Sequence, residues 1–131
     1  DEIWNSYYKF CFERNPFDKA ISLYSWYGKE FSSMHEFILS GMASTIRGFV
    51  LYTINSIPVV DRVYKFEEIT EALKDISAKL KLDSIIELPE KKAKGNVRKD
   101  KRHYREIYTE TEKEWITKIF ARELKYLDYE F

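Results

Sequence analysis

The segment from Lys9 to Tyr24, KFCFERNPFDKAISLY, constrains the fold more than any other part of the chain. Residues 7–12 are mostly β-formers and predict a short strand that ends at Arg-Asn-Pro. Pro16 suits the first turn of a helix, where its missing N–H costs nothing. That helix carries Ser22 eight residues after Arg14. Free backbone N–H groups at a positive helix end, a guanidinium and a hydroxyl together suit a phosphate group.

Further along the chain, predicted strands alternate with predicted helices, which indicates an α/β domain. Residues 44–57 fit either a loose helix or a strand. Asp83–Gly95 is predicted to be a loop that leads into an exposed basic loop. We predict a helix over Met34–Leu39 capped by Ser32 or Ser33, and a strand over Val59–Phe66. An amphipathic helix is predicted from Ile69 to Leu80. The capping-box sequence Thr109–Glu112 predicts the start of a last helix, which carries Trp115, Ile116, Ile119, Phe120 and Leu124 on one face.

Length and composition limit the possible classes of protein. A chain of 131 residues supports one domain, residues 1–131. The formal net charge is zero, yet Lys91–Arg105 holds eight Lys or Arg against one acid, which points to a local anionic partner. The single cysteine, Cys11, excludes an intrachain disulfide and is expected to pack as a small hydrophobe. No apolar run reaches eighteen residues, so we expect no membrane-spanning segment in this chain.

Three segments together resemble a known family. They are RNPFDKAISLY (14–24), DRVYKFEEI (61–69), and the C-terminal stretch that runs from HYREIYT (103–109) to DYEF (128–131). Their order and spacing resemble the carbohydrate (family 2) sulfotransferases that use 3′-phosphoadenosine 5′-phosphosulfate (PAPS). The resemblance implies a helix-rich α/β fold of the P-loop-NTPase-like sulfotransferase type. It also implies PAPS, or its product 3′-phosphoadenosine 5′-phosphate (PAP), as the bound nucleotide, and a carbohydrate or other hydroxyl compound as acceptor.

The resemblance also implies site residues. In the family the arginine and serine of the first motif hold the 3′-phosphate, and these positions are Arg14 and Ser22 here. A basic, glycine-containing loop folds over the nucleotide, which places Lys94, Gly95, Asn96 and Arg98 in the cofactor site. Glu67 matches a family glutamate, and we interpret it as a structural or orienting residue. Two histidines and one cysteine at these spacings predict no metal site.

One family signature does not occur in this sequence. There is no GxxxxGK[ST] and no Pro-Lys-x-Gly-x-[ST] segment to cradle the 5′-phosphosulfate, and no catalytic base can be assigned. The chain therefore resembles the C-terminal two-thirds of a sulfotransferase domain without the upstream P-loop strand, and alone it is expected to be inactive. Two alternatives remain open. They are a non-catalytic remnant that binds PAP or another anion, and a nucleic-acid-binding module built on residues 91–105. A net charge of zero and the lack of a recognised motif argue against nucleic acid.

Overall fold

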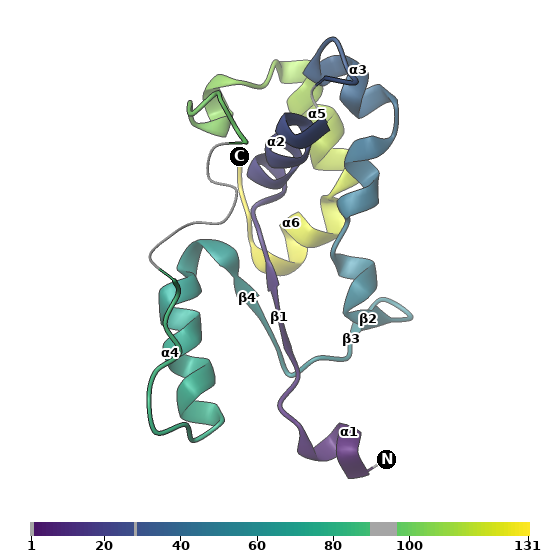
Figure 1. Ribbon diagram of the computed structural model, residues 1–131. Helices are drawn as coiled ribbons and strands as arrows, with labels where there is room; N and C mark the ends of the chain where they lie inside the picture. The colour runs from purple at the N-terminus through teal and green to yellow at the C-terminus, as the bar shows by residue number, and fades with distance from the viewer. Residues whose placement is uncertain (1, 28, 90–96) are drawn as a thin grey trace. The chain divides into compact units, whose positions relative to one another are not determined.

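The computed structural model describes residues 2–27, 29–89 and 97–131 (Figure 1). Contacts group the chain into two compact units, each built from two segments. The first unit comprises Asp1–Arg14 and Val50–Lys91, and the second comprises Asn15–Phe49 and Lys92–Phe131. Helices predominate over strands in both, so the structure combines many helices with little sheet and is compatible with an α/β class.

A parallel pair of strands organises the first unit. Strand β1 (Phe10–Glu13) pairs with β4 (Arg62–Lys65), with Phe10 opposite Arg62 and Glu13 opposite Lys65. Both predicted strands exist but are shorter than residues 7–12 and 59–66, because only four residues of each find a partner. Lys9 fixes the start of the ladder: its backbone N–H donates to the Asp61 carboxylate at 2.7 Å, and the Asp61 N–H donates back to the Lys9 carbonyl at 2.8 Å.

The segment that the sequence left open between helix and strand contains both types of short element. Two 3₁₀-helices, η1 (Met42–Ile46) and η2 (Phe49–Leu51), precede a hairpin of β2 (Thr53–Ile54) and β3 (Ile57–Pro58). The hairpin turn is Asn55-Ser56, whose φ angles are 52° and 64°. Two consecutive positive φ angles match the twist of a tight hairpin, and asparagine tolerates them better than most residues.

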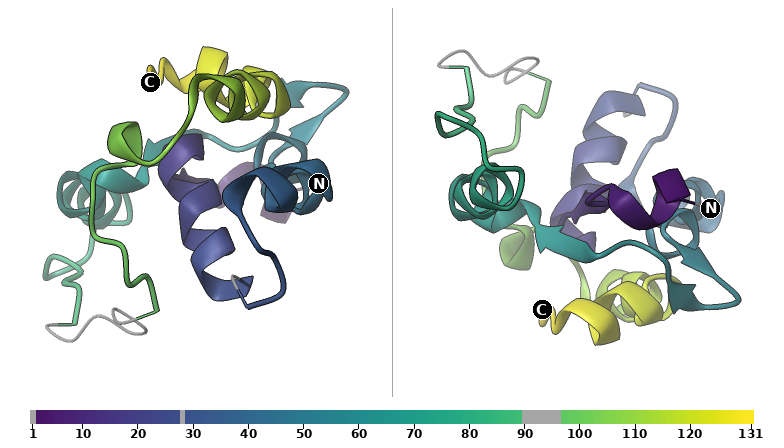
Figure 2. Two further views of the ribbon diagram at one scale, coloured as in Figure 1. Left: turned by 90° about the horizontal axis from the view of Figure 1, so that it is seen from above. Right: turned by 90° about the horizontal axis from the view of Figure 1, so that it is seen from below.

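Helix α4 (Ile69–Lys79) covers the sheet of the first unit. It follows β4 through the 3₁₀-turn η3 (Phe66–Glu68), and Figure 2 shows it beside the carboxyl end of β4. Ala72 and Ile76 of α4 pack against Tyr64 of β4. The Tyr64 hydroxyl lies 2.7 Å from that of Tyr8 and also bonds to the Asp75 carboxylate. Burial, followed by these hydrogen bonds, raises the pKa of Tyr64, so the phenol remains a donor. The N-terminal helix α1 (Glu2–Ser6) buries no side chain.

The second unit is a cluster of helices around an apolar core. Helix α2 (Pro16–Tyr27), helix α3 (Met34–Leu39) and helix α5 (Glu110–Ile119) supply most of the core, with α6 (Ala121–Leu127) and the 3₁₀-turn η4 (Tyr104–Glu106) beside them. The buried core consists of Phe17, Ala20, Ile21, Met34, Phe37, Ile38, Ala43, Ile116 and Phe120. The predicted helix that begins at Pro16 and carries Ser22 and the predicted helix over Met34–Leu39 are thereby confirmed.

Helix starts in the second unit follow the capping chemistry that the sequence predicts. The Ser33 hydroxyl accepts from the Glu36 N–H at 3.1 Å, and Thr109 and Glu112 form a complete capping box.

The helix predicted after Thr109 is interrupted, however. Phe120 has φ −107° and ψ 24°, which ends α5 and begins α6. Its fully buried ring is held in the core at the point where the backbone bends.

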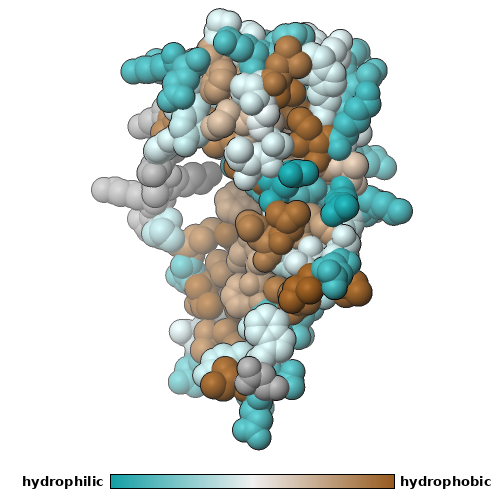
Figure 3. All heavy atoms as spheres, turned by 90° about the vertical axis from the view of Figure 1, so that its right-hand side faces the viewer, coloured by the Kyte–Doolittle hydropathy of each residue, from teal (hydrophilic) through white to brown (hydrophobic). Residues whose placement is uncertain are grey.

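Large apolar side chains also remain on the surface, mostly in the first unit. Figure 3 shows one face of the molecule, on which apolar patches (brown) interrupt the polar surface. The exposed apolar side chains of the first unit include Trp4, Leu51, Ile54, Ile57, Ile85 and Leu88. Within the described residues, no helix has both the length and the apolar character needed to cross a membrane.

The two units are expected to differ in local stability. Among the described residues, the core of the second unit has nine buried apolar side chains, whereas that of the first has three, beside a two-stranded sheet that is marginal by itself. Backbone amides in α4 should therefore exchange with deuterium faster than those in α5, because exchange follows the local free energy of opening. Hydrogen exchange read by mass spectrometry measures this order, and equal protection of both helices would contradict it.

Removal of the Thr109 cap should destabilise the protein. Thr109→Ala leaves the Glu112 N–H without its side-chain acceptor and should lower the free energy of unfolding by about 1 kcal/mol, whereas Thr109→Ser should retain most of the cap. Urea unfolding followed by circular dichroism gives both values. A loss of equal size in the serine variant would mean that the methyl group, not the cap, stabilises this site.

Candidate functional site

The first part of the candidate site is the carboxyl end of the parallel pair. Arg14 follows β1 directly and Phe66 follows β4, so both stand at the same edge of the sheet. The Arg14 guanidinium lies over the Phe66 ring at 5.4 Å from its centroid, and the Arg14 N–H donates to the Glu13 carboxylate at 3.3 Å. The carboxyl ends of parallel strands are where open α/β sheets bind ligands. The first unit thus places Arg14, the first residue of one resembling segment, beside Phe66 of another.

The second part is the start of α2, in the second unit. The Asn15 side-chain oxygen accepts from the Phe17 N–H at 3.0 Å, and the Asn15 carbonyl accepts from the Lys19 N–H at 2.9 Å. Asn15 therefore caps the helix, and Pro16 has no N–H to offer. The expectation that this turn leaves its backbone N–H groups free is wrong for Phe17, because the neighbouring amide already occupies its N–H.

Ser22 lies on α2 with its side chain half-buried. Within the described part of the chain its hydroxyl has no hydrogen-bond partner, whereas the Ser25 hydroxyl donates to the Ile21 carbonyl at 2.8 Å. Ser22 can therefore donate to a ligand without giving up an internal bond. Arg14 belongs to the first unit and Ser22 to the second, and their approach to one phosphate group stays a prediction.

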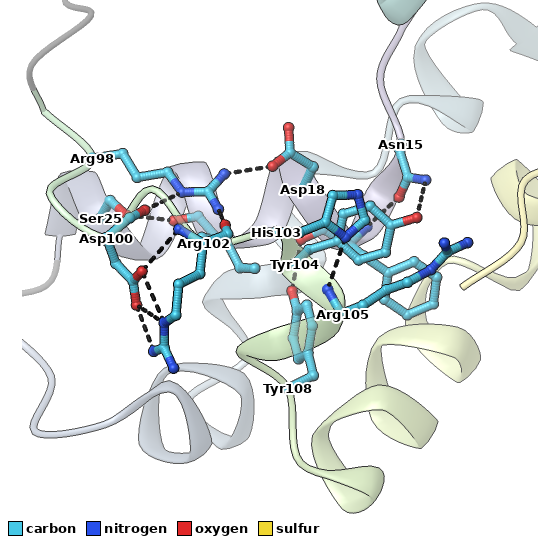
Figure 4. Close-up of polar contacts among 12 residues, drawn as sticks. Asn15, Asp18, Ser25, Arg98, Asp100, Arg102, His103, Tyr104, Arg105 and Tyr108 are labelled. Atoms are coloured by element: carbon cyan, nitrogen blue, oxygen red, sulfur yellow. Dashed lines mark hydrogen bonds and ion pairs between the residues drawn. The ribbon is translucent and has the colours of Figure 1, made fainter.

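An aromatic cluster brings the third resembling segment onto the start of α2. The Phe17 ring is stacked on Tyr104 with a centroid distance of 5.8 Å and meets the Phe131 ring edge-on at 4.8 Å. The Tyr108 hydroxyl donates to the Phe17 carbonyl at 2.7 Å (Figure 4). Burial is the main reason why the pKa of Tyr108 is raised, so its hydroxyl keeps the proton that this bond needs. The second unit therefore joins the first and third resembling segments.

Arg98 does not lie open in a solvated loop, as the sequence led us to expect. Its side chain is only 19% exposed, and it forms an ion pair of 2.5 Å with Asp18 of α2. The neighbouring Arg102 is more exposed and pairs with Asp100, and hydrogen bonds from the Arg102 side chain lower the pKa of the Asp100 carboxyl to about 2. The sequence reasoning missed Asp18. Its partner Arg98 lies 80 residues away along the chain, so the sequence gives no local signal for the pair.

The other predicted site residues fall in different places. Lys94, Gly95 and Asn96 lie outside the described residues. Glu67 is exposed on η3, and His103 is exposed at the start of η4, where its Nδ1 accepts from the Arg105 N–H at 3.4 Å. Among the described residues, no group of His, Cys, Asp and Glu is arranged to hold a metal ion.

Comparisons with known proteins add no further assignment. No protein-family model, curated protein or solved structure matches this chain.

The thiol beside the candidate site should be unreactive. Cys11 lies in β1, three residues before Arg14, and burial together with the nearby Glu13 charge raises its pKa to about 11. Since the thiolate is the nucleophile, the rate of alkylation by iodoacetamide at pH 8 should be about a hundredfold below that of a thiol with pKa 9. The unfolded protein in urea is the control. An equal rate in the folded protein would contradict this pKa.

Proposed function

We propose that this protein is a PAPS-dependent sulfotransferase, with Arg14 and Ser22 as ligands of the 3′-phosphate of the nucleotide. The acceptor class is a hydroxyl or amine compound, and a carbohydrate is the one we favour. The proposal begins from the three resembling segments of the sequence. The observation that carries it is the packing of these segments within each unit: Arg14, the first residue of one segment, lies over Phe66 of the next in the first unit, and residues 15–24 pack with 103–108 and Phe131 in the second.

The chemistry of the two residues fits their proposed roles. A guanidinium can donate two parallel hydrogen bonds to phosphate oxygens, and a serine hydroxyl can donate to a third oxygen. PAP and PAPS carry a 3′-phosphate that AMP and ATP lack. A pair of donors dedicated to that group would therefore select the sulfate-carrying nucleotide from the far more common adenine nucleotides.

The reaction that follows from this proposal is an in-line transfer. An acceptor oxygen or nitrogen attacks the sulfur atom and forms a new bond, the bond between sulfur and the bridging phosphate oxygen breaks, and PAP leaves. The acceptor's proton passes to a base, to which we assign no residue. Positioned cations would stabilise the charge that develops on the leaving phosphate.

A second candidate function is PAP binding without transfer. The observation in its favour is that the sequence holds no glycine-rich segment with lysine and Ser/Thr suited to the 5′-phosphosulfate. The two functions share the 3′-phosphate contacts and differ only in turnover. Incubation with PAPS and a panel of carbohydrates separates them, since only an enzyme releases PAP in proportion to acceptor.

Arg14 should determine the preference for PAP over AMP. Loss of its charge-assisted contact in Arg14→Ala should cost about 1.5–3 kcal/mol of PAP binding, roughly ten- to a hundredfold in affinity, and leave AMP binding nearly unchanged. Arg14→Lys should restore only part, because an ammonium cannot form the planar fork. Titration calorimetry at one fixed salt concentration measures both nucleotides, since phosphate contacts are screened by salt.

The matched control is Arg47→Ala. Arg47 is an exposed arginine of the second unit outside the resembling segments, and its Nε donates to the Ser44 carbonyl. Its removal changes the net charge equally and should leave the ratio of the two affinities unaltered. Equal affinity of the wild-type protein for PAP and AMP would refute the proposed role of the Arg-Asn-Pro motif.

A further inference from the structure

The Arg98 guanidinium is already bonded to three acceptors of the protein itself. Its Nη1 donates to the Asp18 carboxylate at 2.5 Å, its Nε to the Asp100 carbonyl at 2.7 Å, and its Nη2 to the Arg102 carbonyl at 2.5 Å (Figure 4). All three guanidinium nitrogens thus face protein acceptors. The two bonds to backbone carbonyls fix the conformation of residues 98–102, and the bond to Asp18 joins this segment to α2.

A second attachment to α2 lies a few residues further along. The Tyr104 ring stacks on Phe17, and the Tyr104 hydroxyl lies 3.4 Å from the Asn15 side-chain nitrogen, which donates to it. The Arg105 guanidinium lies over the same tyrosine ring, 5.7 Å from its centroid. We name residues 97–108 the strap. The strap is therefore attached to the first turn of α2 at two residues, Asp18 and Phe17.

We infer that Arg98 is a positioning residue rather than a phosphate ligand: with Asp18 it fastens the strap to α2 and so fixes where the strap's exposed cations, Lys99 and Arg105 among them, meet an anionic ligand. That the ligand is a nucleotide rests on the proposed function. The fastening itself rests only on the contacts of Arg98. A planar fork of five N–H donors suits this work, because one side chain can hold a carboxylate and two carbonyls at fixed angles.

The two possible roles of Arg98 make opposite predictions for Asp18. If Arg98 bound phosphate directly, Asp18 would compete with the ligand for the guanidinium and repel its charge, so Asp18→Asn would tighten PAP binding. If Arg98 positions the strap, Asp18→Asn loosens it and weakens PAP binding. Asparagine has nearly the shape of aspartate, so this variant removes the charge with little change in packing.

The experiment measures two properties of each variant: deuterium exchange of the strap amides and affinity for PAP. The variants are Asp18→Asn, Arg98→Ala and the double variant, with Asp18→Glu as the version that keeps the carboxylate. Both single variants should speed strap exchange about tenfold and leave α5 protected. Each should weaken PAP binding about tenfold, and the double variant should lose no more than either, because the two residues form one attachment.

Lys99→Ala is the matched control for the exchange measurement, since it removes the same charge from the adjacent, exposed position without breaking the attachment to α2. It should leave strap exchange unaltered, and Asp18→Glu should retain most of the wild-type protection. Strap exchange unchanged in both single variants, or tighter PAP binding by Asp18→Asn, would overturn the inference. A wild-type protein that does not bind PAP would refute the proposed function, and the exchange measurements would still decide whether Arg98 and Asp18 fasten the strap.

Discussion

The second unit depends on the packing of Phe17 at the first turn of α2. Its ring is 1% exposed and meets Tyr104, Tyr108 and Phe131, which all come from the last 28 residues of the chain. Aromatic side chains bury large areas with defined geometry, so one such cluster can fix both the start of a helix and a distant terminal segment. The hydrogen bond from Tyr108 to the Phe17 carbonyl adds a polar contact to this apolar cluster.

The first unit depends on a different kind of contact. Its apolar core is small, and polar groups supply much of the specificity: the Lys9–Asp61 bonds set the register of the parallel pair, and Asp75 of α4 bonds to the Tyr64 hydroxyl. The Tyr64 bond is partly buried, so an arrangement that breaks it leaves a donor unsatisfied, whereas the Lys9–Asp61 bonds are exposed and contribute mainly their geometry at the start of the ladder. Four paired residues in each strand are therefore enough to define the arrangement that carries Arg14.

Features set by neighbouring residues were predictable from the sequence, and features set by distant ones were not. Helices α2, α3 and α4 and the Thr109 cap follow from apolar spacing and capping residues that lie within a few positions of one another. The strand lengths were wrong because a partner about fifty residues away limits them. The pairing of Arg98 with Asp18 was missed for the same reason, since any of many acids could neutralise a cation in a basic run. The break at Phe120 follows from packing of its ring and carries no Gly or Pro signal.

The charge of residues 91–105, read from the sequence alone, overstates what a ligand of this region would meet. Of the cations in its described part, Arg98 is bound to Asp18 and Arg102 to Asp100. An ion pair has little net charge at a distance, so these two arginines add little to the long-range attraction of an anion. Their contribution is geometric, because they hold the backbone on which Lys99 and Arg105 are displayed. A count of basic residues in a sequence therefore indicates an anionic partner only after the residues that form ion pairs within the protein have been subtracted.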